Sequence, residues 1–179
     1  MLVQENSLSE TQQPQRLLLS MPLSRNQIEK TIEEIDYLAN PSSERYGRLL
    51  NWQNPFDPFW HYGIGLSDLH IFDTGRGLCP FEKREAKLVI GIDHIAFKPD
   101  QTVKRLKHAL HVFADWEYTF TGWNCEHLAR LIATDQPRCY QSSPIWWLCD
   151  MTPEGDHKVA RQIFQDYLKE VEPRDAEAL

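Results

Sequence analysis

Apolar residues first recur at helical spacing just after Ser24. Ser24 and Gln27 make the pattern of a capping box, and Asn40-Pro41 would end the helix that they begin. Four apolar residues fall on one face of this helix: Ile28, Ile32, Ile35 and Leu38. We therefore expect residues 24–55 to form a helical extension, which follows a polar and mobile segment over residues 1–23.

The segment 61–73 shows instead the period-two alternation of a β-hairpin. Small and polar residues alternate there with apolar ones: His61, Tyr62, Gly63, Ile64, Gly65 and Leu66. Ser67-Asp68 then supply turn chemistry before a short second strand that ends at Asp73. The length of the loop decides which side chains share a face, because successive residues of a strand point to opposite faces.

A three-residue loop places Asp73 and His61 on one face of the hairpin. In that register Gly63 faces Asp73, which makes Asp73 a diagonal neighbour of His61. Leu66 then faces His70, and the apolar residues gather on the other face together with His70. A two-residue loop would turn Asp73 away from His61. The three-residue loop is preferred because it leaves the His61 face open.

Three later segments complete an α+β pattern. The apolar stretch at residues 87–97 predicts one or two strands against the hairpin, and Pro99-Asp100 begin a second amphipathic helix. A last helix is predicted over about residues 156–171, with a buried stripe of Val159, Ile163, Phe164, Tyr167 and Leu168. We expect a small antiparallel sheet packed on helices over residues 56–150, followed by a C-terminal helix and tail over residues 151–179.

The string Asn124-Cys125-Glu126-His127 places a cysteine at the start of a further predicted helix. Asn124 would cap this helix, and its apolar residues fall three to four positions apart: Leu128, Leu131 and Ile132. N–H groups at a helix N-terminus favour the thiolate, which is the nucleophilic form of cysteine. Cys125 is therefore the candidate nucleophile, with His61 as general base and Asp73 as the carboxylate that orients His61.

The neighbours of Cys125 have structural interpretations. His127 lies about 200° round the helix from Cys125, so it would face away and act as a structural hydrogen-bonding residue. Glu126 would complement the helix dipole as a first-turn acid. The remaining histidines show no ligand spacing: His94, His108, His111 and His157.

These residues resemble the lecithin retinol acyltransferase family, a circularly permuted branch of the NlpC-like papain fold. The resemblance rests on His61, on a polar residue twelve positions later and on the Asn-Cys-Glu-His string. It covers roughly residues 55–145, with further matching positions at Tyr118, Leu128-Ala129-Arg130, Thr134 and Cys139-Tyr140-Gln141. Mammalian members carry a second histidine where this chain has Asp73, a change that keeps a Cys-His-polar triad.

The resemblance implies acyl transfer or hydrolysis through an acyl-thioester on Cys125, with no metal or organic cofactor. It implies lipid acyl groups as the substrate class, although the wider fold also cleaves peptide amides. The alternative from another class is a catalytically silent binding or assembly module, which would use the same groove for a protein partner. The predicted N-terminal helix and an aromatic run at residues 144–149 would suit that module.

Composition excludes several other classes. A formal net charge of −7 and a pI near 5.5 argue against nucleic acid as the main partner. The four cysteines contain no CxxC pair and no zinc spacing, so no structural zinc or redox motif is indicated. No apolar run is long enough for a signal peptide or a membrane span, so the expected location is the cytoplasm, with peripheral membrane contact as an open alternative.

Two features near the predicted site keep more than one interpretation. Arg76, in the loop after Asp73, could bind an anionic substrate group, but a solvated loop arginine is the simpler interpretation. Trp146-Trp147, within the aromatic run, could belong to a core strand, a pocket wall or an interfacial anchor. The core strand is the simplest of these.

Overall fold

The computed structural model describes residues 24–53, 60–81, 87–88, 96–114, 116, 123–139 and 154–172. Several sequence predictions lie outside these ranges: the N-terminal segment 1–23, the centre of the apolar stretch at residues 89–95, Tyr118 and the aromatic run at residues 144–149. Within the described residues, four helices and five strands form an α+β fold, as the sequence predicts.

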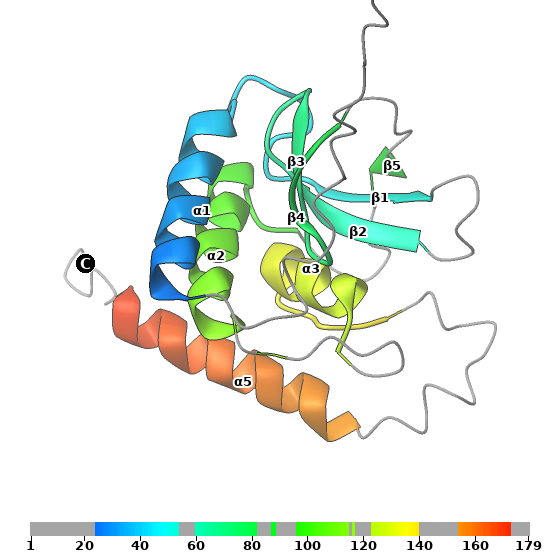
Figure 1. The fold of residues 1–179 in the computed structure, drawn as a ribbon. Coiled ribbons are helices and arrows are strands. Elements are labelled where there is room, and N and C mark those ends of the chain that lie inside the picture. The colour runs from blue at the N-terminus through cyan, green and yellow to red at the C-terminus, as the bar shows by residue number, and fades with distance from the viewer. Residues whose placement is uncertain are drawn as a thin grey trace, which may run out of the picture.

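The five described strands form one antiparallel sheet in the order β4-β3-β2-β1-β5 (Figure 1). Their bounds are Leu49–Gln53 for β1, Trp60–Gly65 for β2, His70–Asp73 for β3, Gly77–Pro80 for β4 and Lys87–Leu88 for β5. β1 pairs with β2 along its whole length, from Leu49 opposite Ile64 to Gln53 opposite Trp60. β5 pairs with the edge of β1 that faces away from β2. It is therefore not a pairing partner of the β2–β3 hairpin.

Strand β1 lies inside residues 24–55, which the sequence analysis assigns to a helical extension. Leu49, Leu50 and Trp52 of this strand are all buried, although they point to both faces of the sheet. A strand that is covered on both faces lacks the clean alternation that marks a half-exposed strand. That extension therefore contributes a central strand to the sheet as well as its helix.

The helices cover one face of the sheet (Figure 1). Their bounds are Arg25–Leu38 for α1, Pro99–Val112 for α2, Cys125–Thr134 for α3 and Glu154–Val171 for α5. α3 lies directly against β2, α2 packs on α3, and both α1 and α5 contact α2. The predicted capping box of the first helix is confirmed, because Gln27 N donates to Ser24 Oγ and Ser24 N donates to Gln27 Oε1.

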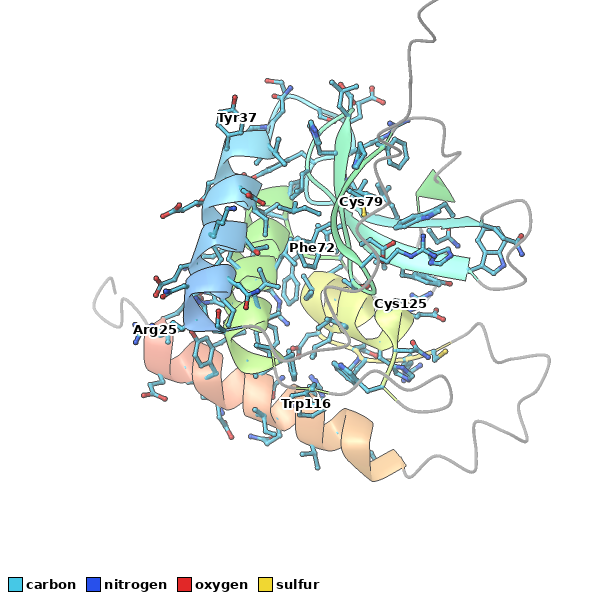
Figure 2. All side chains as sticks on the ribbon, in the orientation of Figure 1. Arg25, Tyr37, Phe72, Cys79, Trp116 and Cys125 are labelled. Atoms are coloured by element: carbon cyan, nitrogen blue, oxygen red, sulfur yellow. The ribbon has the colours of Figure 1, made fainter. Side chains whose placement is uncertain are left out.

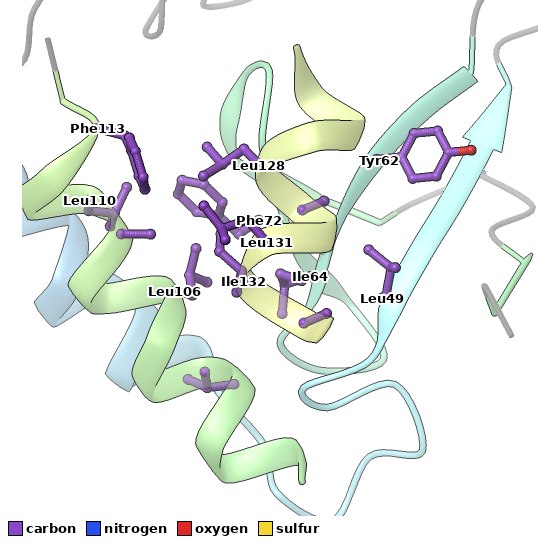
Figure 3. Close-up of a cluster of buried hydrophobic side chains, with 14 of the residues drawn as sticks. Leu49, Tyr62, Ile64, Phe72, Leu106, Leu110, Phe113, Leu128, Leu131 and Ile132 are labelled. Atoms are coloured by element: carbon purple, nitrogen blue, oxygen red, sulfur yellow. The ribbon is translucent and has the colours of Figure 1, made fainter. Parts of the chain in front are cut away.

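The main hydrophobic core lies between α2, α3 and one face of β2 and β3 (Figure 3). Deeply buried members of this core come from both layers, among them Ile64, Phe72, Leu106, Leu131 and Ile132. A second, smaller cluster lies apart from this core and consists of Leu50, Trp52, Ile71 and Phe81. By strand alternation these sheet residues point to the face opposite the helices, so the sheet is covered on both sides near its centre.

α5 buries a narrower stripe than the sequence predicts. Ala160 and Phe164 are fully buried, whereas Val159 is 50% exposed and Ile163 is 42% exposed. The residues of α5 that pack on the core form one line along the helix: Ala160, Phe164 and the partly buried Leu168. Val159 and Ile163 each precede a residue of this line, so their side chains point about 100° away from it. The prediction that Val159 and Ile163 are buried is wrong, because the apolar contacts of α5 follow this line, whereas the predicted Tyr167 and Leu168 are partly buried.

A buried arginine from α2 holds the C-terminal end of α3. Arg105 Nε donates to Ile132 O at 2.9 Å, and Arg105 Nη2 donates to Leu131 O at 2.8 Å. Asp135 ends the helix in the left-handed region and accepts from Arg105 and from Arg161 of α5, each at 2.9 Å. These donors satisfy carbonyls that a helix C-terminus leaves open, so they fix α3 against α2 and α5.

The β2–β3 hairpin has the predicted register. Gly63 pairs with Asp73, and Leu66 N donates to His70 O at 3.0 Å, which leaves a three-residue loop. Directly paired residues share a face, and residues two apart along a strand share it too. Asp73 therefore lies on the same face of the sheet as His61, as the three-residue loop requires.

Gly63 allows this part of the hairpin to pack closely. A Cβ at position 63 would collide with the carbonyl oxygen of Phe72 and would lie 3.1 Å from Cη2 of Trp52. A strand glycine is expected where another backbone or ring approaches closely. The absence of a side chain at this position thus lets Trp52 and the β3 main chain close over β2.

Candidate active site

Cys125 is the first residue of α3, as the sequence predicts. Asn124 is the N-cap in an extended conformation, and its side-chain oxygen accepts from Glu126 N at 3.0 Å and from His127 N at 3.3 Å. This cap fixes the first turn and orients the N–H groups at the helix start. Cys125 itself is only partly buried, so its thiol is accessible at the end of a well-formed helix.

The thiol of Cys125 lies at the beginning of β2. Its sulfur is 3.9 Å from the carbonyl oxygen of Trp60, whose peptide bond leads directly into His61. Figure 2 shows Cys125 at the end of α3 that faces the strands. The structure therefore brings the predicted nucleophile to the strand residue that precedes the predicted base.

Thr74 ties the cysteine to the hairpin. Its buried hydroxyl is 2.7 Å from the carbonyl oxygen of Cys125 and 2.9 Å from that of Tyr62, while Thr74 N donates to the same Tyr62 carbonyl at 3.1 Å. The single hydroxyl proton is shared between the two carbonyls. A threonine in a turn carries no signal for such a role, so the sequence analysis did not single it out.

Asp73 and Gly75 complete the turn that wraps around the start of α3. Asp73 has no exposed surface, and its Oδ1 accepts from Gly75 N at 2.8 Å. A Cβ placed on Gly75 would lie 3.4 Å from that same Oδ1 and 3.6 Å from the Cβ of Cys125. Gly75 thus lies beside both the Asp73 carboxylate and Cys125.

By strand alternation, the side chain of His61 lies on the face of the sheet opposite to α3. Its partly buried ring stacks on the fully buried indole of Trp52, with ring centroids 5.9 Å apart and planes at 18°. The stacking restricts the orientation of the ring, and Asp73 shares its face of the sheet. The contact of the turn after Asp73 with β2 continues to Thr74, whose N–H donates to Tyr62 O at 3.1 Å.

Glu126 does more than the sequence predicts of a first-turn acid. It is fully buried and pairs with Arg130, which is 7% exposed, at 2.8 Å between Oε1 and Nε. The Tyr62 hydroxyl hydrogen-bonds to Glu126 and to Asn51, and burial together with the Glu126 charge raises the pKa of Tyr62. This polar network, which the sequence analysis missed, joins the first turn of α3 to β2 beside His61.

Two further histidines and an arginine lie on the elements that form the candidate site or in their loops. His127 is 3% exposed and stacks on Trp123 at 5.9 Å between ring centroids, which agrees with a structural role. His70 Nδ1 lies 3.2 Å from Ser67 Oγ in the hairpin loop, and strand alternation turns it to the other face from His61. Arg76 is exposed in the turn after Gly75.

His108 lies on α2, outside the candidate site, where the C-terminal end of α5 packs against α2. His108 Nε2 is 3.1 Å from Glu172 Oε1, and Lys104 Nζ is 2.8 Å from the same oxygen. Burial lowers the pKa of His108, whereas the hydrogen bond from Lys104 lowers the pKa of Glu172. His108 therefore belongs to a charged cluster between α2 and the end of α5, outside the candidate site.

The described residues contain no group of three His, Cys, Asp or Glu side chains that could hold a metal ion. No helix in the part of the chain that the structure describes is long and apolar enough to cross a membrane. Comparisons with protein-family models, with curated proteins and with solved structures find no match to this chain. The candidate site is therefore defined by its own residues: a capped cysteine that meets β2, the strand of His61, next to the turn that begins at Asp73 of β3.

Proposed function

We propose that this protein is a thiol-dependent acyltransferase or hydrolase that forms an acyl-thioester on Cys125. The observation that carries the proposal is the position of the Cys125 sulfur, at a capped helix start and 3.9 Å from the carbonyl that precedes His61. His61 shares a sheet face with the buried Asp73, which supports a base with an orienting carboxylate. The resemblance to the lecithin retinol acyltransferase family supports the same roles and a permuted papain-like fold.

In the proposed reaction, His61 removes the proton from the Cys125 thiol, and the thiolate attacks the carbonyl carbon of the acyl donor. The oxyanion forms beside the Cys125 N–H, at the positive end of the α3 dipole. The intermediate expels the leaving alkoxide or amine, which takes the proton from His61, and the acyl group stays on sulfur. His61 then deprotonates water or another acceptor, whose attack releases the acyl group and restores the thiol.

The proposed acyl donor is a lipid ester, such as a fatty-acyl ester of a phospholipid. This choice rests on the family resemblance, and an ester donor also suits a partly buried thiol with one general base. A peptide amide is the other donor that the wider fold accepts. Both donors would form the same acyl-thioester, so one chemical assay can compare them.

The test is incubation of the protein with a short-chain phosphatidylcholine, followed by mass measurement of the intact chain. We expect a mass increase of one acyl group, which hydroxylamine removes because thioesters are more susceptible than amides. Cys125→Ser should abolish the adduct, whereas Cys79→Ser should keep it, since Cys79 lies on β4. Asp73→Asn should slow formation of the adduct without unfolding the protein, because the change is nearly isosteric.

The outcome also distinguishes the enzyme from a silent binding module. If only a peptide amide donor forms the adduct, the proposed substrate class changes from lipid to peptide, while the proposed acyl-thioester mechanism stays. If lipid, ester and amide donors all leave Cys125 unmodified while the folded protein binds a protein partner tightly, the catalytic proposal is wrong.

A further inference from the structure

A buried acid stands directly beside the proposed nucleophile. Glu126 follows Cys125 in the first turn of α3 and has no exposed surface. Like charges close together disfavour each other, and burial weakens the screening that water would provide. An isolated carboxylate at this position would therefore oppose the thiolate that the proposed reaction requires.

Arg130 supplies the opposite charge one helical turn later. Its Nε donates to Glu126 Oε1 at 2.8 Å, and both side chains are almost completely buried. Its guanidinium also lies 5.6 Å from the centroid of the Tyr62 ring on β2. Arg130 is thus enclosed between α3 and β2, where its charge acts at short range.

We infer that Arg130 is a positioning residue of the proposed reaction: it neutralises Glu126, so that the first turn of α3 can hold both a buried acid and a thiolate. The inference rests on the proposed function, since it assigns a role only to a thiolate at Cys125. The Glu126–Arg130 pair acts through Cys125 and does not contact the reacting atoms. Its second effect is geometric, because the Glu126 to Tyr62 hydrogen bond joins the cysteine helix to the strand of His61.

Among the described residues, the charged and titratable groups around Cys125 come from three elements and from the segment after α3, where Cys139 Sγ lies 3.5 Å from Nδ2 of Asn124. α3 contributes Glu126, Arg130 and the stacked His127. β2 contributes His61 and the Tyr62 phenol, which burial keeps neutral. β3 contributes Asp73, whose Oδ1 is bonded by Gly75 N. Among these groups, the Glu126–Arg130 pair is the one whose two charges can be removed separately without changing the proposed base or its carboxylate.

Removal of one charge at a time should shift the pKa of the Cys125 thiol in opposite directions, whereas a purely structural role of the pair does not predict this. Glu126→Gln leaves the positive charge of Arg130 near the thiol, so it should favour the thiolate. Arg130→Met leaves the negative charge of Glu126, so it should disfavour the thiolate. The double variant removes both charges, so the pKa of its Cys125 thiol should return close to the wild-type value. Loss of a merely structural bond would instead shift this pKa in the same direction in both single variants.

The experiment measures the rate at which iodoacetamide alkylates Cys125 as a function of pH, with the modified residue identified by peptide mass. We expect the inflection to move up by about one unit in Arg130→Met and down in Glu126→Gln. Arg130→Lys should restore most of the wild-type profile, because lysine keeps the charge. Arg161→Met is the matched control, since Arg161 pairs with Asp135 at the other end of α3 and should leave the profile unchanged.

The outcomes separate this inference from the proposed function. If Cys125 of the wild-type protein shows no inflection below that of an ordinary thiol, the proposed function fails first. If the wild-type inflection is low but neither single variant shifts it in the expected direction, only the role of Arg130 is overturned. Should Arg130→Met not fold, the Glu126→Gln and double variants decide, because the first must lower the inflection and the second must restore it.

Discussion

Replacement of Thr74 by valine tests whether a single hydroxyl holds the nucleophile in place. Valine keeps the shape and the β-branch of threonine but removes the group that lies 2.7 Å from the Cys125 carbonyl. The residue is fully buried, so no water replaces the lost donor. The start of α3 should then move relative to β2, where the thiol must meet His61.

The magnitude follows from the bonds that the hydroxyl makes. Its one proton is shared between two carbonyls, so its loss should cost about 1 kcal/mol of the free energy of unfolding. In a protein of this size that corresponds to a fall in Tm of about 2–4 °C. A small displacement of a nucleophile has a larger effect on rate, and we expect Cys125 acylation to slow by about tenfold.

The assay compares Tm and acylation rate in three variants. Thr74→Ser keeps the hydroxyl but loses a buried methyl group, so its Tm should fall by a similar amount while the acylation rate stays near wild type. Thr134→Val removes a hydroxyl that donates to Arg130 O at 2.8 Å at the far end of α3, and it too should leave the rate unchanged. Equal acylation rates in Thr74→Val and Thr134→Val would refute the reasoning.

Three further predictions concern the strand, the thiol and pH. Gly63→Ala should lower the free energy of unfolding by about 1–3 kcal/mol in a denaturant titration, because the added Cβ meets the β3 main chain, and an unchanged midpoint would contradict the close packing. Iodoacetamide should alkylate Cys125 with an inflection below that of an ordinary thiol, and His61→Ala should move it upward; two identical profiles would mean that these residues do not interact. The folded pKa values of His108 and Glu172 lie below their ordinary values, so the unfolded chain binds more protons and Tm should fall as pH drops below about 6.5. His108→Gln should flatten the upper part of that pH dependence, and an unaltered slope would exclude His108 as its source.

The sequence predicts the hairpin and the starts of α1, α2 and α3 because these depend on neighbouring residues. Alternation together with Ser67-Asp68 is enough to favour the three-residue loop, which the pairing of Gly63 with Asp73 confirms. The Asn124 cap and the Ser24 capping box are confirmed for the same reason. Local chemistry fixes local geometry, so these parts of the fold and of the candidate site could be predicted.

The features that the sequence does not reveal depend on residues distant along the chain. The β1 strand carries no clear alternation because both of its faces are covered. Arg105 resembles a solvated helix residue in the sequence, yet it is buried against main-chain carbonyls of α3 that lie more than 25 residues later. The i,i+4 spacing of Glu126 and Arg130 is local, but the burial of this pair depends on the packing of α3 on β2. The exposed Ile163 shows the converse, since an apolar residue at helical spacing does not fix how the helix is rotated.

The division of the proposed site between the two sides of the sheet has a consequence for how its parts can vary. Cys125 belongs to the helix that the large core supports, whereas the ring of His61 rests on Trp52 in the small cluster on the other side. Substitutions in the large core would shift the nucleophile, while substitutions beneath Trp52 would turn the base and leave the nucleophile where it is. The relative position of the thiol and the imidazole thus depends on two separate hydrophobic clusters, one on each face of the sheet. Strand β2 lies between them and contacts both clusters.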